Sequence, residues 1–208
     1  MKTRLAAVLW GLTFSWGVQA AEPLPLFDAH LHYNVEAAQG PYPLDTVLKL
    51  FRDNRITGIL ANSRPNDGTR ALYEAKPKDV WVVPFIRPYI VQPDRYSWFN
   101  DPKIYALIES EHKRGYYQGI GEFHLFGNDA KTEWVKKTVD FAVAHHLYLH
   151  AHSDDAAVDI IFAHNPKVKI VWSQYASIMN GYRDWLAALP KDVAEMIAWR
   201  NAECLFRK

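Results

Sequence analysis

Two histidines separated by one residue lie in a segment whose pattern predicts a β-strand. Residues 26–32 alternate apolar and polar side chains and follow two prolines, which is typical of a strand with one buried face. Because residues two apart in a strand point to the same side, His30 and His32 share a face with Asp28. Two imidazoles on one face can reach a single ion at Zn–N distances of roughly 2.0–2.1 Å. The pair predicts half of a metal site; the alternative is a pair of surface histidines on an edge strand.

Polar side chains also stand at the ends of other predicted strands. They are Asn62 in residues 56–62, Arg87 after residues 80–86, Glu122 and His124 in residues 119–125, and His150 and His152 in residues 147–153. In parallel β/α folds the carboxyl ends of the strands form the face on which sites assemble. Histidine and carboxylate ligands suit Zn²⁺ and related ions, which lower the pKa of bound water to about 7. We expect a site on this face, with His152, nearer the loop, a better ligand than His150.

These residues also have ordinary structural interpretations. Glu122 and His124 would equally form a satisfied buried pair, and for His124 the two interpretations are balanced. Arg87 would either pair with an acidic residue or bind a substrate carboxylate or phosphate. His145 and His146 end a predicted helix, where the dipole favours imidazolium, so a structural role is expected.

The pattern along the chain alternates strands with amphipathic helices. Residues 168–172 predict a sixth strand. Helices are predicted over residues 43–53, 67–76, 103–114, 132–146, 154–163, 178–189 and 193–199. Strands separated by helices favour a parallel sheet with right-handed crossovers. Since no linker interrupts the pattern, we expect one domain over residues 21–208.

The first 20 residues predict a signal peptide rather than part of the fold. Lys2 and Arg4 precede an apolar run over residues 5–18, and small residues suited to cleavage follow. The run is shorter than the ~20 residues of a membrane anchor. We therefore expect export, most simply to a bacterial periplasm, and no membrane association after cleavage.

Composition narrows the classes of function. About 190 residues remain after the leader, enough for one sizeable core. A net charge of +1, with both signs scattered along the chain, argues against a nucleic-acid partner. Cys204 is the single cysteine, so the chain has no internal disulfide and a metal site must use histidine and carboxylate ligands.

Taken together, these segments resemble the amidohydrolase superfamily, in particular its amidohydrolase-related metal-dependent hydrolases. The resemblance covers nearly all of the mature chain and is carried by residues 28–32, 119–124, 149–152, 165–172 and 199–206. It implies a TIM-barrel-like (β/α)₈ fold, one or two divalent ions, most simply Zn²⁺, and hydrolysis by metal-bound hydroxide, with decarboxylation in some members. Carried over, His30 and His32 would bind metal, Glu122 would bind or bridge it, and His152 would be a further ligand.

The chain departs from the family pattern after its sixth strand. The family expects a histidine there and an aspartate at the end of strand eight, whereas Trp172 runs into Ser173, Gln174 and Tyr175. We find six strands and expect an incomplete barrel, with strands seven and eight absent near residues 172–174. Asp154, Asp155 and Asp184 are the carboxylates that would replace the missing aspartate, although Asp154 is expected to cap its helix. The open edges would be protected by a second copy in a homodimer.

The leading interpretation is an exported metal-dependent hydrolase acting on a small molecule. Metal-bound hydroxide would attack a carbonyl (amide, ester or lactone) or a phosphoester, with Glu122 and Arg87 as catalytic groups. Substrate contacts are expected from Asn62, Arg87, His124 and His150. One alternative is a catalytically silent, truncated relative that still binds metal; another is a β/α binding protein without metal.

Overall fold

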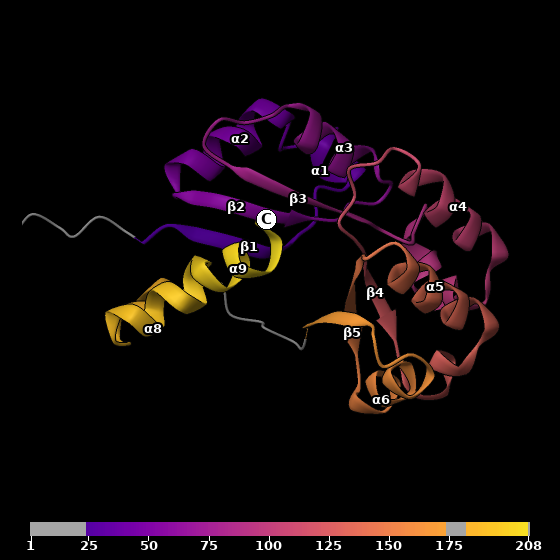
Figure 1. Cartoon of the computed structure of the whole chain (residues 1–208). Helices are drawn as coiled ribbons and strands as arrows, with labels where there is room; N and C mark the ends of the chain where they lie inside the picture. The colour runs from indigo at the N-terminus through magenta and orange to yellow at the C-terminus, as the bar shows by residue number, and fades with distance from the viewer. Residues whose placement is uncertain (1–23, 174–181, 208) are drawn as a thin grey trace, which may run out of the picture.

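The computed structural model describes residues 24–173 and 182–207, and it shows an α/β fold on one parallel sheet. The strands are β1 (Leu26–Leu31), β2 (Ile56–Ala61), β3 (Trp81–Ile86), β4 (Gly119–Leu125), β5 (Tyr148–Ser153) and β6 (Lys169–Ser173). Each strand pairs in parallel with the next in the chain. The sheet curls into half of a barrel (Figure 1). This architecture is compatible with a partial TIM-barrel-like fold.

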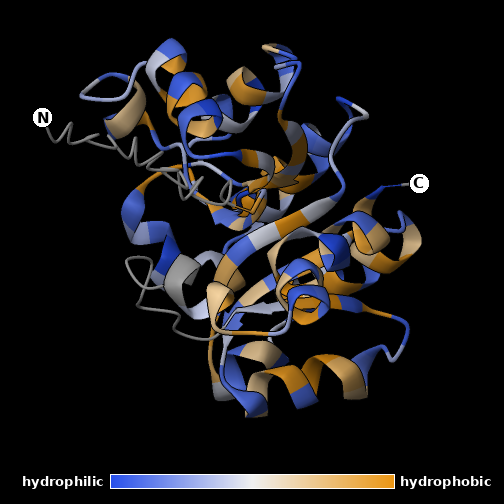
Figure 2. Cartoon of the chain, turned by 90° about the vertical axis from the view of Figure 1, so that its left-hand side faces the viewer, coloured by the Kyte–Doolittle hydropathy of each residue, from blue (hydrophilic) through white to orange (hydrophobic). Residues whose placement is uncertain are grey.

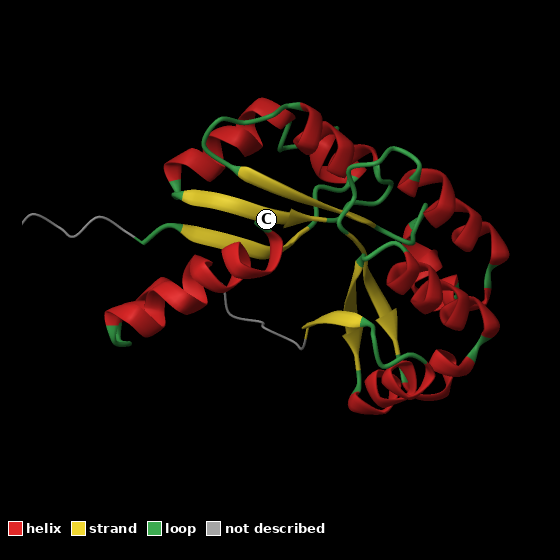
Figure 3. Cartoon of the chain, in the orientation of Figure 1, coloured by secondary structure: helices red, strands yellow, loops and turns green. Residues whose placement is uncertain are grey.

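Helices cover the convex side of this sheet, and a C-terminal group lies on the other side. The first set is α1 (Val35–Ala38), α2 (Leu44–Asp53), α3 (Asp67–Glu74), α4 (Pro102–His112), α5 (Glu133–Ala144) and α6 (Asp155–His164). The second is α7 (Tyr182–Ala187), α8 (Lys191–Glu195) and α9 (Asn201–Phe206), with a π-helical turn at Met196–Arg200. Short 3₁₀ helices lie at η1 (Gln92–Tyr96), η2 (Trp98–Asn100) and η3 (Gly127–Lys131). Figure 3 shows the two groups on opposite sides of the strands.

The prediction of six strands in a parallel sheet is confirmed, and the boundaries differ in a few places. The first strand ends at Leu31, so His32 lies just beyond it. The helix predicted over residues 193–199 instead forms part of a longer helical segment that runs from Lys191 to Phe206. The short helix α1 and the 3₁₀ helices were not predicted, because they lack a repeated apolar period. The predicted leader, residues 178–181 and Gln174 lie outside the described residues.

The main core lies between the sheet and the helices on its convex side. Buried side chains of β4 and β5, such as Ile120 and Leu149, pack against Ile108 of α4, Val139 of α5 and Ile161 of α6. A second cluster joins the first three strands to α2 and α3. Helices of this side carry hydrophilic and hydrophobic residues along their length, as amphipathic helices do (Figure 2). This packing fixes the strands and hence the positions of their carboxyl ends.

The concave side of the sheet is filled from the C-terminal segment. Phe206 of α9 packs with Leu60, Val83 and Phe85, which point inward from β2 and β3. Its ring centroid lies 6.1 Å from that of Phe27 on β1 and 5.2 Å from that of Tyr148 on β5. One aromatic side chain therefore contacts inward-facing residues from across the curl.

The two edges of the sheet approach each other where the strands end. β1 pairs with β2 and β6 pairs with β5, so each presents one edge. Nevertheless, the Ser173 Oγ of β6 lies 3.4 Å from the His30 Nδ1 of β1. No helix within residues 24–173 and 182–207 has the length and apolar character needed to cross a membrane.

Candidate metal centre

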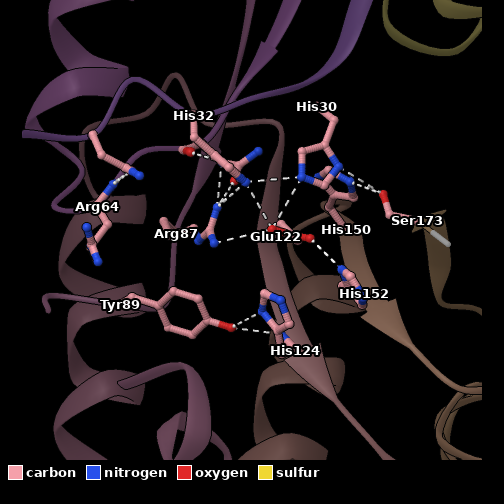
Figure 4. A network of polar contacts seen from close by, with 12 residues as sticks. His30, His32, Arg64, Arg87, Tyr89, Glu122, His124, His150, His152 and Ser173 are labelled. Atoms are coloured by element: carbon pink, nitrogen blue, oxygen red, sulfur yellow. Dashed lines mark hydrogen bonds and ion pairs between the residues drawn. The ribbon is translucent and has the colours of Figure 1, made fainter. Parts of the chain in front are cut away.

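A buried carboxylate collects the predicted histidines. Glu122 of β4 is 2% exposed, and its Oε2 lies 3.4 Å from the Nε2 of His30 and 3.1 Å from the Nε2 of His32. Its other oxygen, Oε1, lies 3.0 Å from the Nδ1 of His152 on β5. Figure 4 shows these side chains converging from β1, β4 and β5. The carboxyl ends of three strands thus meet at one carboxylate.

The local backbone of β4 places Glu122 in this position. The register with β5 shifts between Gly121 and Phe123, so Glu122 is displaced from regular pairing. Gly121 has φ +127°, and a Cβ there would lie 2.2 Å from the carbonyl oxygen of His150. A side chain at position 121 would therefore collide with β5, and glycine allows the close approach.

Hydrogen bonds fix which nitrogen of His32 faces Glu122. The Nδ1 of His32 lies 2.8 Å from the backbone oxygen of Asn62, and since a carbonyl can only accept, Nδ1 carries the hydrogen. The lone pair is then on Nε2, which lies 3.1 Å from the Nε2 of His30. The Nε2 atoms of His30 and His32 and the Oε2 of Glu122 therefore lie within 3.1–3.4 Å of one another. A proton or a cation between such acceptor atoms stabilises their close approach.

The geometry at Glu122 fits a metal ion. Its Oε2 is buried and makes no hydrogen bond of acceptable geometry in the described residues, although three cationic or ring groups surround it. The group of His30, His32 and Glu122 offers ligand atoms within 4.8 Å of one another, as does the group of Glu122, His124 and His152. Both groups could hold a metal ion, and they share Glu122. The four predicted ligands are therefore divided between two overlapping groups.

The second group is hindered by a hydrogen bond to His124. The Tyr89 hydroxyl accepts from the backbone N–H of His124 at 2.7 Å, so its own hydrogen is directed to the Nδ1 of His124 at 3.1 Å. The hydrogen of the His124 ring is then on Nε2. Burial lowers the pKa of His124 to about 4, so the ring is neutral at pH 7. Metal ligation by His124 requires one of these hydrogens to be displaced, which favours the first group.

Arg87 is the fixed cation of the centre. It is 7% exposed, and its Nη2 lies 3.2 Å from the Oε2 of Glu122. Its Nη1 donates to the Oδ1 of Asn62 at 2.6 Å and lies against the His32 ring, 2.6 Å from Nδ1 and 2.9 Å from Nε2. Burial raises the pKa of Glu122, but the close approach of His30 and His32 and the charge of Arg87 outweigh this effect, so the net pKa is well below the ordinary value. Glu122 is therefore an anion that lies beside the guanidinium of Arg87.

His150 and Ser173 form the inner wall of the centre. His150 is fully buried, and its Nε2 lies 2.6 Å from the Oγ of Ser173, which also faces His30. Burial is the main reason why the pKa of His150 is lowered to about 3. Sequence reasoning missed Ser173 and Tyr89 as members of the site. The only sequence feature that could have indicated these two residues is their place at or just beyond the end of a strand.

All eight predicted site residues are brought to this end of the sheet. Asn62 and His150 are fully buried, so their predicted contacts with substrate stay predictions. Asp28 accepts from the backbone N–H of His30 and is in neither ligand group. Asp154 caps α6 by accepting from the N–H of Ala157, as expected.

Among known proteins, no family model matches this chain and no curated protein matches it. The resemblance to the amidohydrolase superfamily therefore stays a prediction from the sequence motifs.

Proposed function

We propose that this protein is a metal-dependent hydrolase of the amidohydrolase type. The observation that carries the proposal is the buried Oε2 of Glu122 with the Nε2 atoms of His30 and His32 at 3.4 and 3.1 Å. Oxygen and imidazole ligands suit Zn²⁺, and one ion there is the simplest occupancy. When bound, such an ion polarises a carbonyl or phosphoryl oxygen and lowers the pKa of water.

The residues around the ligands have separate roles in this proposal. Asn62 holds the tautomer of His32 through its backbone oxygen, and Ser173 faces the outer nitrogen of His30. Such contacts orient ligating histidines and increase their basicity. Arg87 neutralises Glu122. With an ion held by the Oε2 of Glu122, the guanidinium of Arg87 would be available to bind substrate oxygens. His152 donates to the Oε1 of Glu122 and holds the carboxylate from its other side.

A catalytically silent metal-binding protein is the second candidate. Within residues 24–173 and 182–207, both ligand groups contain Glu122 as their single carboxylate. A hydrolase of this type needs a further base to move a proton, and the described strands end at β6. This observation favours the silent relative, and activity decides between the two.

The first experiment measures metal content by mass spectrometry in the purified protein and in a His30→Ala/His32→Ala variant. We expect about one ion per chain in the wild type and a loss of most of it in the variant. The matched control is His112→Ala/His145→Ala, which removes two neighbouring imidazoles whose centroids lie 4.3 Å apart, outside either ligand group. An unchanged metal content in the His30→Ala/His32→Ala variant would refute the proposed centre.

Activity is then measured on the metal-loaded protein with a panel of aryl esters, lactones, amides and phosphoesters. The hydrolase predicts turnover that falls together with metal content in the double variant. Retained metal without turnover of any of these bonds supports the silent relative instead.

A further inference from the structure

An open cavity of about 290 Å³ lies beside the second ligand group. Three aromatic side chains line it, Tyr96, Phe99 and Phe126, and His124 and His152 form its inner side. Its volume is near the lower end of small-molecule sites, about 300–1,000 Å³, and suits a ligand of one ring. A larger cavity of about 590 Å³ lies near Trp81 and Arg207 and is lined by none of the ligand residues.

The aromatic lining is unusually exposed for side chains of this type. Tyr96 is 65% exposed and Phe126 is 48% exposed. Aromatic side chains that stay in water around a concave site gain most when a planar apolar group covers them. The walls of this cavity therefore favour a flat ring.

The cavity also contains a cation that has no carboxylate partner among residues 24–173 and 182–207. The guanidinium of Arg95 lies over the Tyr96 ring at 4.3 Å and contacts its hydroxyl. The neighbouring carboxylate of Asp94 accepts from the backbone N–H groups of Ile90 and Val91 at 2.6 and 2.9 Å. The exposed Asp129 lines the cavity but forms no ion pair with Arg95. Arg95 is therefore available to pair with an anion.

The inner side of the cavity offers a hydrogen-bond donor. Because the Nδ1 of His124 accepts from Tyr89, the ring hydrogen of His124 is on Nε2. The His124 ring stacks on that of His152 with centroids 4.5 Å apart, and His152 contacts Glu122. A ligand in the cavity is thus one side chain away from the metal centre.

We propose that this cavity binds a planar aromatic ring that carries a carboxylate. The ring lies among Tyr96, Phe99 and Phe126, and the carboxylate pairs with Arg95. The inference rests on the proposed function, because it names the substrates of the proposed metal centre. These substrates would be esters or amides of an aromatic acid that keep a free carboxylate.

Binding is tested on the full protein in the presence of a chelator, by titration calorimetry and by intrinsic tryptophan fluorescence. Trp98 contributes to this signal, and its indole donates to the backbone oxygen of His124 at 2.7 Å. The probes are benzoate, cyclohexanecarboxylate, benzamide and benzamidine. We expect benzoate to bind, with cyclohexanecarboxylate and benzamide weaker by about tenfold, because each lacks the planar ring or the charge.

Variants separate the two parts of the cavity. Arg95→Met should weaken benzoate binding about tenfold and leave benzamide unchanged, whereas Arg95→Lys should recover part of the loss. Phe126→Ala should weaken both probes. Arg52→Met, which removes an exposed arginine of α2, is the matched control and should change neither. Circular dichroism checks that each variant is folded.

The inference would be overturned by the absence of saturable benzoate binding below about 10 mM, or by equal benzoate binding to the wild type and to Arg95→Met. Stronger binding of benzamidine than of benzoate would also overturn it, since Asp129 would then govern the cavity. Metal content measured on the same preparation before the chelator is added keeps the two proposals apart. Metal without benzoate binding refutes the inference alone, and benzoate binding without metal refutes the proposed function alone.

Discussion

Glu122 shows how a single buried charge is kept at this site. An unpaired carboxylate at 2% exposure would be unstable, because burial disfavours the charged form. Arg87 and three imidazoles surround it instead. The Oε2 that carries the charge, and the Nε2 atoms of His30 and His32 that face it, are the atoms that an ion would bind. Binding an ion therefore competes with contacts that already stabilise the protein.

Arg87→Met tests this competition. In the presence of a chelator we expect the free energy of unfolding to fall by about 3 kcal/mol, since the buried Glu122 loses its fixed partner. Added Zn²⁺ should stabilise the variant more than the wild type, because the ion no longer displaces a guanidinium. Urea unfolding with and without Zn²⁺ measures both effects.

The control for this change is Arg114→Met, whose ion pair with Glu111 lies at the surface and contributes little to stability. If Arg87→Met were as stable as the control without metal, the buried pair would not hold the centre together.

Burial of the neutral His150 ring makes the stability of the protein fall at acid pH. Its folded pKa of about 3 lies below the 6.5 of an ordinary histidine, so the unfolded chain takes up a proton first as the pH falls. The stability that the neutral ring contributes is complete above pH 6.5 and is lost progressively down to about pH 3. His124, with a pKa of about 4, acts in the same direction. Urea unfolding at several pH values, with chelator present, should show this decline.

His150→Gln should make the decline shallower, because the variant has no proton to gain at this position. The comparison is made on slopes rather than on absolute stability, since the substitution also changes packing. If the free energy of unfolding fell with pH equally steeply in the wild type and in the variant, His150 would not be the cause of the decline.

The site residues could be predicted from the sequence because the apolar pattern indicates where each strand ends. The period of two around His30 and His32, and the ordered strands after it, placed all eight candidates at one end of the sheet. The hydrogen bonds that determine the tautomers of His32 and His124 could not be predicted from the sequence. Tyr89 and Ser173 act through such bonds, and side-chain direction depends on packing that a sequence period does not specify.

The C-terminal helices show the same limit at the scale of an element. Their apolar period was visible, but the surface they cover was not. Ala194, Ala198 and Ala202 recur every four residues, and these small side chains allow a close approach to the sheet. The partner of Phe206 is the concave face formed by strands far away in sequence.

Phe206→Ala should lower the free energy of unfolding by about 3–4 kcal/mol, because a large buried ring leaves a cavity. Leu205→Ala, at the neighbouring position, changes a side chain that is 48% exposed and should cost less than about 1 kcal/mol. Urea unfolding measures both. The folded fraction of Phe206→Ala should still bind metal, since no ligand lies on α9. An equal cost for the two variants would mean that Phe206 does not fill the concave face.

At the scale of the whole molecule, the sheet is a half-barrel whose edges meet at one end. The sequence predicted six strands and two open edges, and the described residues contain six. It did not predict that β1 and β6 would come together at His30 and Ser173, since curvature arises from the packing of all strands at once. The expected homodimer stays a prediction, which light scattering in solution would check.

A metal ion at this centre should stabilise the whole molecule, because its ligands come from β1 and β4. At a Zn²⁺ concentration about 100 times the dissociation constant, the gain is about 2.7 kcal/mol, or roughly 5–10 °C in melting temperature. Mg²⁺, which prefers oxygen ligands, should give a much smaller shift. Scanning calorimetry with each ion checks this. Equal shifts for the two ions would indicate non-specific binding.

The contact between His30 and Ser173 also bears on how the chain folds. Each strand pairs with the one just before it, so the sheet grows by short steps, whereas this contact joins residues 143 apart. Closing a longer loop costs more chain entropy. The meeting of the two edges is therefore favourable only after the intervening strands are in place. A refolding chain would regain its helices and strands before it regained the ability to bind an ion.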